Sequence, residues 1–148
     1  MSGHRREHRQ RALAFQTLYG HALDRAATEE QLAALYAHAA QTQGLDASLQ
    51  GFGWSLALGA WQKEKELNAV MERFARNRPL GEIGRLEQVL LRLGLYEIIY
   101  QFTEPKIVMS ESMILAEEFA AGPGGKFVNG VLDAATRNLS AIRGEAHP

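Results

Sequence analysis

Apolar residues recur at spacings of three and four along nearly the whole chain, and this period constrains the fold more than any other feature of the sequence. Such spacing places the apolar side chains on one face of an α-helix. In the segment RQRALAFQTLYGHAL, for example, one face is formed by Ala12, Phe15, either Leu18 or Tyr19, and Ala22. No segment alternates apolar and polar residues over the length of a strand. The sequence therefore predicts an all-α fold.

Capping and helix-breaking residues divide this pattern into separate helices. Thr28 and Gln31 have the spacing of a capping box, which predicts the start of a second helix that Gly44 ends. A third helix is expected over residues 48–77, and the Pro79–Gly81 segment breaks the pattern after it. We take this break as the boundary between two halves.

The second half begins with EIGRLEQVLLRLGLYEIIYQF. Apolar residues cover most of the circumference of this segment, which predicts the buried central helix of the half. The next segment, KIVMSESMILAEEFAA, favours a helix with Ser110 as its N-cap, although Ile107 and Val108 would also suit the start of a strand. The last amphipathic helix is expected from Phe127 to Ile142.

The charge of the chain is unevenly distributed. The net charge is −1, but the N-terminal MSGHRREHRQR holds four arginines against one glutamate, which gives +3 there and leaves −4 for the other 137 residues. Such a basic end is typical of an arm that binds polyanions, and a solvated, frayed terminus is the alternative. The expected organisation is a basic arm over residues 1–11 and one helical domain over residues 12–148, with halves at about 12–78 and 83–142.

Residue types argue against several classes of function. The chain has no cysteine, so it has no disulfide framework, cysteine zinc site or thiol nucleophile. It has no apolar run long enough to cross a membrane, and its N-terminus lacks the apolar stretch of a signal peptide, which together predict a cytoplasmic protein. The histidines are scattered, and nothing resembles a catalytic serine, histidine and aspartate set. We therefore expect a binding protein without cofactor or metal, not an enzyme.

The glycine-rich stretch AAGPGGKFVNGV, residues 120–131, invites comparison with a nucleotide-binding loop. The Walker pattern requires a glycine where this chain has Ala120, and a serine or threonine where it has Phe127. The strand that precedes such a loop is also missing from the pattern. We therefore expect a turn between helices, with Lys126 and the unpaired N–H groups of the next helix available to an anion.

Arginines and aromatic residues together favour single-stranded RNA as a ligand, because cations attract phosphates and exposed rings stack on unpaired bases. The candidates lie in three places: Tyr19 after the arginine arm, Phe74 among Arg73, Arg76 and Arg78, and Phe127 after Lys126. For Tyr19 and Phe127 the alternative is packing in the core. For the three arginines it is interaction with the carboxyl end of the third helix.

Three motifs occur in the order and at the separations found in the NusB family of bacterial transcription antitermination factors: RALAFQTLYG, GEIGRLEQVLLRLGLYEIIY and KFVNGVLD. The chain resembles this family over nearly its whole length, and KFVNGVLD is a specific motif. Residues 22–51 are the least informative part. The resemblance implies an all-helical protein whose two halves, each similar to a three-helix bundle, pack together into one compact domain.

The resemblance also implies a function and partners. Members of the family bind boxA, a short single-stranded element of ribosomal RNA leader transcripts, as a heterodimer with a small-subunit ribosomal protein. The pair joins other Nus factors on RNA polymerase. Antitermination follows from this assembly without a chemical step.

The resemblance assigns site residues by position. The RNA-binding set is Arg5, Arg6, Arg9, Tyr19, Phe74, Arg92, Lys126 and Phe127. Glu87 matches a position near the junction of the RNA and the ribosomal protein. Asn129 and Gly130 are expected to be structural, as a polar group on the helix surface and a close-packing site.

The sequence departs from the family immediately before KFVNGVLD. Many relatives have acidic and hydrogen-bonding residues there, whereas this chain has Gly122, Pro123, Gly124 and Gly125. The change removes a serine suited to cap the last helix, and this chain lacks any partner contact that those side chains make in the relatives.

Two other functions are compatible with the sequence. The fold of the family also serves as the RNA-binding domain of certain rRNA cytosine methyltransferases, but this chain has neither the catalytic cysteine nor the glycine-rich cofactor loop of such an enzyme. A helical interaction module without an RNA role would need only apolar helix faces, for example to form a homodimer. The arginine arm and the aromatic–cation pairs argue against this second alternative.

Overall fold

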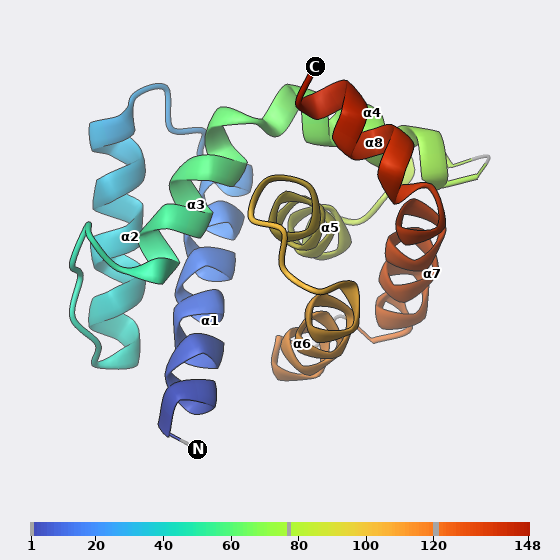
Figure 1. Ribbon diagram of the computed structural model, residues 1–148. Coiled ribbons are helices and arrows are strands. Elements are labelled where there is room, and N and C mark those ends of the chain that lie inside the picture. Colours follow the sequence, from blue (N-terminus) through green and yellow to red (C-terminus); the bar gives the residue numbers. More distant parts are fainter. Residues whose placement is uncertain (1, 77, 120–121) are drawn as a thin grey trace. The chain divides into compact units, whose positions relative to one another are not determined.

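The computed structural model describes residues 2–76, 78–119 and 122–148. Every regular element in these ranges is a helix, so the predicted all-α fold is confirmed. The chain forms two compact units, Met1–Gln62 and Lys63–Pro148 (Figure 1). The division lies between two helices at Lys63, and not in the Pro79–Gly81 segment that the sequence suggested. None of the described helices is both long enough and apolar enough to span a bilayer.

The first unit contains α1 (Ser2–Leu23), α2 (Glu29–Gln43) and α3 (Phe52–Gln62). In this unit α1 packs against both of the other helices. Tyr36 of α2 and Trp54 of α3 meet edge to face in the core, with ring centroids 5.4 Å apart. Helix α3 approaches α1 closely at Gly53. A Cβ at this position would lie 2.8 Å from the Gln10 backbone oxygen of α1, which explains the glycine.

The predicted start of α2 at Thr28 is confirmed, and Gln31 reaches back one residue further than in a standard capping box, to Ala27 instead of Thr28. Thr28 Oγ1 accepts a hydrogen bond from the Gln31 N–H at 3.2 Å, and Gln31 Oε1 accepts one from the Ala27 N–H at 2.6 Å. These bonds satisfy N–H groups that have no partner inside the helix. Gly44 ends α2 as predicted, in the left-handed conformation with φ of 67°.

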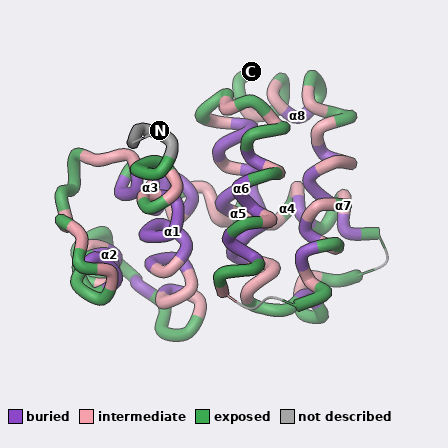
Figure 2. The backbone as a smooth tube through the Cα atoms, turned by 90° about the horizontal axis from the view of Figure 1, so that it is seen from below, coloured by how far each residue is buried: buried purple, intermediate pink, exposed green. Residues whose placement is uncertain are grey.

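The second unit contains α4 (Glu64–Phe74), the short 3-10 turn η1 (Leu80–Glu82), α5 (Arg85–Tyr100), α6 (Pro105–Glu118), α7 (Gly124–Arg137) and α8 (Leu139–Ala146). The predicted central role of the LEQVLLRLGLYEIIY segment is confirmed, because α5 packs against α4, α6, α7 and α8. Figure 2 shows that α5 is buried along most of its length. This helix is therefore the scaffold on which the surface helices of the unit are placed.

The single helix predicted over residues 48–77 is wrong. The segment forms α3 and α4, which are separated at Lys63. The two helices bury their apolar faces in different cores: α3 places Leu56 in the first unit, whereas α4 places Leu67 and Met71 in the second.

Other helix boundaries in the second unit also differ from the predictions. Helix α6 begins at Pro105, where the missing N–H costs no hydrogen bond, so Ser110 is an exposed residue inside the helix and not its cap. Ile107 and Val108 are helical, which excludes the strand alternative. The last predicted helix begins earlier, at Gly124, and is interrupted at Asn138. The Asn138 side chain donates to a carbonyl one turn earlier, at 2.9 Å, and so competes with the backbone ladder.

Candidate nucleic-acid interface

The N-terminal arginines lie on the first turns of α1, which is continuous from Ser2 to Leu23. Arg5, Arg6 and Arg9 are all exposed. Arg5 and Arg9 are four residues apart and therefore lie on the same helix face. A helical arm presents its guanidinium groups at fixed spacing, whereas a disordered arm would have to be ordered when a polyanion binds.

Tyr19 lies about 15 Å beyond Arg9 along the same helix. Its partly exposed ring stacks on buried Phe15, with ring centroids 6.2 Å apart and an angle of 9° between the planes. The sequence left core packing and an exposed ring as alternatives for Tyr19. The structure shows that one face of the ring packs on the core while part of the ring reaches the surface.

In the second unit, a groove beside the end of α4 and α7 collects residues from distant parts of the chain. Its volume is about 470 Å³. The groove is lined by Phe74, Arg76 and Arg78 and by Lys126 and Phe127, among others. Three of the predicted RNA-binding residues, Phe74, Lys126 and Phe127, therefore share one site. Both rings are partly exposed, and Lys126 is exposed.

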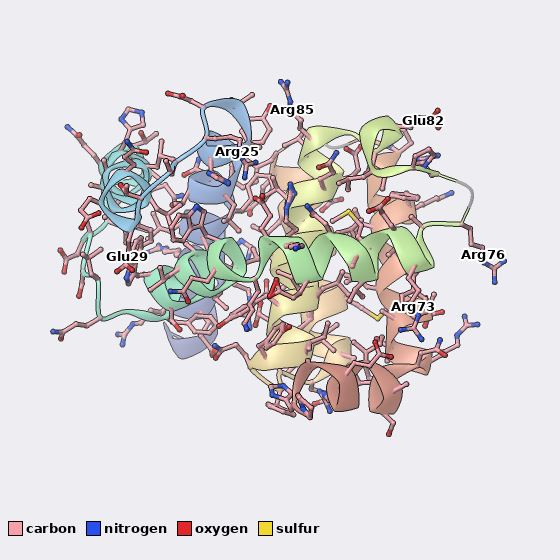
Figure 3. All side chains as sticks on the ribbon, turned by 90° about the horizontal axis from the view of Figure 1, so that it is seen from above. Arg25, Glu29, Arg73, Arg76, Glu82 and Arg85 are labelled. Atoms are coloured by element: carbon pink, nitrogen blue, oxygen red, sulfur yellow. The ribbon has the colours of Figure 1, made fainter. Side chains whose placement is uncertain are left out.

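Each aromatic ring of this groove has a guanidinium group over it. The Arg78 guanidinium lies 4.3 Å from the centroid of Phe127, and that of Arg73 lies 5.2 Å from the centroid of Phe74. Arg73 also forms an ion pair with Glu145 at 3.1 Å. Figure 3 shows Arg73 extending from the end of α4, and Arg76 extending outward from the segment after it. Such pairs place positive charge beside a ring, where a base and its phosphate would both find a partner.

Gly130 is not a close-packing site, contrary to the prediction. It is exposed, and a Cβ at this position would meet no atom within 4 Å. Gly130 instead lines the groove, together with Ala134 one turn later. The prediction failed because a glycine inside a helix is equally compatible with a close neighbour and with open space, and the sequence does not distinguish the two.

Glu87 lies beside the starts of two helices. A Cβ on Gly124 would overlap the Glu87 Oε1 atom, and a Cβ on Gly84 would overlap its Oε2 atom. The carboxylate is therefore at the first turn of α7, where the unpaired N–H groups favour negative charge. A carboxylate from α5 thus lies beside Gly124, within the stretch where this chain lacks the acidic and serine side chains of many relatives.

Arg92 is held against α5 by a neighbouring glutamine. Its guanidinium donates to Gln88 Oε1 at 3.2 Å. The Gln88 amide in turn donates to the carbonyls of Leu80 and Ile83, at 3.0 and 2.8 Å. Gln88 therefore links Arg92 to the turn that precedes α5. The sequence identified Arg92 as a candidate but carried no signal for the role of Gln88.

The candidate residues are divided between the two units. Arg5, Arg6, Arg9 and Tyr19 belong to the first unit, and Phe74, Glu87, Arg92, Lys126 and Phe127 belong to the second. Arg137, which also lines the groove, was missed by the sequence analysis. Arg137 follows Lys126 by eleven residues, which is close to three helical turns and places both cations on one face of a helix. This spacing was the signal in the sequence that could have identified it. Among the described residues, no three His, Asp or Glu side chains are close enough to hold a metal ion.

The chain matches the sequence model of the NusB family over residues 8–137. Transcription antitermination protein NusB of Nitratidesulfovibrio vulgaris is 36% identical over 132 residues, which cover 87% of this chain and 86% of that protein. The protein of the same name from Oleidesulfovibrio alaskensis is 37% identical over 134 residues, which cover 88% and 87%. A solved structure described as antitermination factors NusB and NusE in complex with dsRNA has a TM-score of 0.76 at 25% identity, and the match covers 95% of this chain and 98% of that chain.

Proposed function

This chain belongs to the NusB family, and on that premise we propose that it is a transcription antitermination factor that binds RNA together with a small-subunit ribosomal protein. The RNA is a boxA-like single-stranded element of ribosomal RNA leader transcripts. The heterodimer joins other Nus factors on RNA polymerase in the cytoplasm. The protein acts by assembly and is not an enzyme.

The groove of the second unit carries this proposal. Phe74, Lys126 and Phe127 line one depression in which partly exposed rings lie beside cations. Unpaired bases can stack on such rings while their phosphates face the cations. In an A-form duplex the faces of the bases are covered by their neighbours, so the rings would have no base to stack on. The arrangement therefore favours a single strand over a duplex.

A second groove supports a protein partner beside the RNA. It has a volume of about 500 Å³ and is lined by Met113 and Ile114 of α6 and by Lys126 and other residues at the start of α7. Ile114 is 37% exposed, and Ile107, two turns earlier on the same helix, is 45% exposed. Exposed apolar side chains that gather on one face are typical of a protein interface. Because Lys126 lines both grooves, the two ligands would meet there.

Fluorescence anisotropy with three labelled RNAs tests the proposed function: a boxA-like single strand, a scrambled strand of equal length, and the boxA-like strand in a duplex. We expect the single boxA-like strand to bind most tightly, the ribosomal protein to increase its affinity, and added salt to weaken it. Equal affinity for all three RNAs, or no effect of either the ribosomal protein or salt, would contradict the proposal.

A further inference from the structure

One face of α7 has cations at both ends and small residues between them. Lys126, Gly130, Ala134 and Arg137 follow one another at spacings of four, four and three, so they lie on one face of the helix. All four line the groove beside α4. The row is about 16 Å long, whereas a stacked strand rises about 3.4 Å per nucleotide. This face is therefore long enough for several nucleotides. At Gly130 it is open to solvent, because a Cβ there would meet no atom within 4 Å.

Positive charge predominates along this channel. Arg76 and Arg78 line it from the segment after α4, and Lys126 and Arg137 line it from α7. The acidic residue of the lining is Asp133, which pairs with Arg137. The lining therefore carries +3 in total. Such an excess attracts a polyanion and disfavours a neutral or cationic ligand.

The backbone at Arg76 is unusual. Its φ is 34°, in the left-handed region that side chains other than glycine rarely adopt. Strained residues of this kind persist where the surrounding structure holds them, and they gather at functional sites. The strain lies in the segment that places arginines against the channel.

We propose that this channel holds the sugar-phosphate backbone of an RNA segment that continues beyond Phe127, so that the RNA-binding site extends along α7 to Arg137. The proposal rests on the proposed function, because Lys126 and Phe127 belong to both sites. An acidic protein segment would also meet the cations, but it would leave the rings of Phe74 and Phe127 without a stacking partner. RNA would engage both the cations, through its phosphates, and the two rings, through its bases.

Filling the floor of the channel tests the proposal without changing its charge. Gly130→Leu adds a side chain at an exposed position where no atom lies within 4 Å of the Cβ. The matched control is Gly144→Leu on α8, a second exposed glycine with open space around it. The ligands are an RNA that carries the boxA-like element alone, the same RNA extended by a uridine tract at either end, and the uridine tract alone.

We expect the unmodified protein to bind one of the extended RNAs more tightly than the short RNA. Gly130→Leu should lower the affinity for the extended RNA on the order of tenfold, toward that for the short RNA, whereas Gly144→Leu should leave both unchanged. Melting temperatures of the two variants check that each is folded.

Charge removal provides a second measurement on the same RNAs. Arg76, Arg78 and Arg137 are replaced together by glutamine, and Lys106→Gln removes one exposed cation outside the channel as a control. Each phosphate contact to a single strand contributes about 0.7 to the slope of log affinity against log salt, so the triple variant should lose about 2 from the slope for the extended RNA. Arg78→Lys, which keeps the charge, should retain most of the slope.

The outcomes separate this proposal from the proposed function. If Gly130→Leu and the triple variant bind the extended RNA as the unmodified protein does, the channel proposal is wrong while boxA binding stands. If the short RNA is not bound but binding of the uridine tract is sensitive to Gly130→Leu, the channel stands and boxA recognition is wrong. If Gly130→Leu weakens only the binding of the ribosomal protein, the channel is a protein site and the proposal is overturned.

Discussion

At the scale of single residues, the rings proposed to stack on RNA are also supported by the protein. Tyr19 packs on Phe15, and the Arg78 guanidinium lies over Phe127. Each ring therefore has one side occupied and another part at the surface. This explains why the sequence could not decide between core packing and ligand binding, since a half-buried ring satisfies the spacing rules for both.

Replacing Phe127 by alanine should weaken RNA binding more than it weakens the fold. The loss of one base-stacking ring corresponds to about 1–3 kcal/mol of binding free energy, or roughly fivefold to more than a hundredfold in affinity. Phe102→Ala is the matched control, because Phe102 belongs to the same unit, is 58% exposed and does not line the groove. Anisotropy and thermal melting measure the two effects. A large drop in melting temperature with unchanged affinity would place Phe127 in the core.

Gly124 and Glu87 should be energetically coupled, since a Cβ on Gly124 would overlap the Glu87 carboxylate. Gly→Ala in a helix stabilises a protein by about 0.4–1 kcal/mol where there is room for the methyl group. Gly124→Ala should therefore be stabilising in a Glu87→Ala background, and less stabilising or destabilising in the unmodified protein. Urea denaturation of the four proteins of this cycle measures the coupling.

Gly130→Ala on the same helix is the control for this cycle, because its Cβ has open space and should have the same effect in both backgrounds. Strictly additive effects of Gly124→Ala and Glu87→Ala would show that the carboxylate does not occupy the first turn of α7.

At the scale of helices, some helix ends are set by nearby residues in the sequence, and others are set by tertiary contacts. The start of α2 was predicted from Thr28 and Gln31 and is found there, because a capping box acts within four residues. The break at Lys63 was not predicted, because it depends on which core receives each apolar face. The local signal at Thr28 was therefore sufficient for α2, whereas the break at Lys63 required the tertiary structure.

Thr28→Ala should lower the free energy of unfolding by about 1 kcal/mol, because it removes the acceptor of the Gln31 N–H. Thr42→Ala in the last turn of α2 is a suitable control. Its hydroxyl bonds to the His38 carbonyl, which already belongs to the helix, so the change should be within about 0.5 kcal/mol. Urea denaturation followed by circular dichroism measures both. Equal effects of the two substitutions would mean that the cap does not stabilise the protein.

At the scale of the whole molecule, the attraction of RNA depends more on where the charges lie than on the net charge. The net charge of −1 alone suggests no affinity for a polyanion. However, Arg5, Arg6 and Arg9 are exposed on the first turns of α1 against one exposed acid, Glu7, whereas Arg11 is buried against Phe52. The exposed charge there is therefore +2, and the groove of the second unit carries a further excess of cations. Both features lie on surfaces proposed for RNA, one in each unit. The long-range attraction of RNA should therefore come from these two places.

Replacing Arg5, Arg6 and Arg9 together by glutamine should reduce the salt dependence of RNA binding. If each contacts one phosphate of a single strand, the slope of log affinity against log salt should fall by about 2. Arg25→Gln, which removes an exposed arginine of the same unit, is the control and should leave the slope nearly unchanged. Titrations at several salt concentrations measure the slope. A slope equal to that of the unmodified protein would show that the helical arm does not contact RNA.

The sequence by itself determined that this chain is all-helical, that Thr28 and Gly44 bound α2, which segment forms the buried helix α5, and which family motifs it carries. These properties depend on period and on neighbours within a few residues, so a linear pattern records them. Only the tertiary structure decided that Phe74 and Phe127 line one groove, that Gly130 faces open space, and that Glu87 lies at the start of α7. These facts depend on packing between residues far apart in the chain, and no local spacing encodes which distant side chain fills a given space.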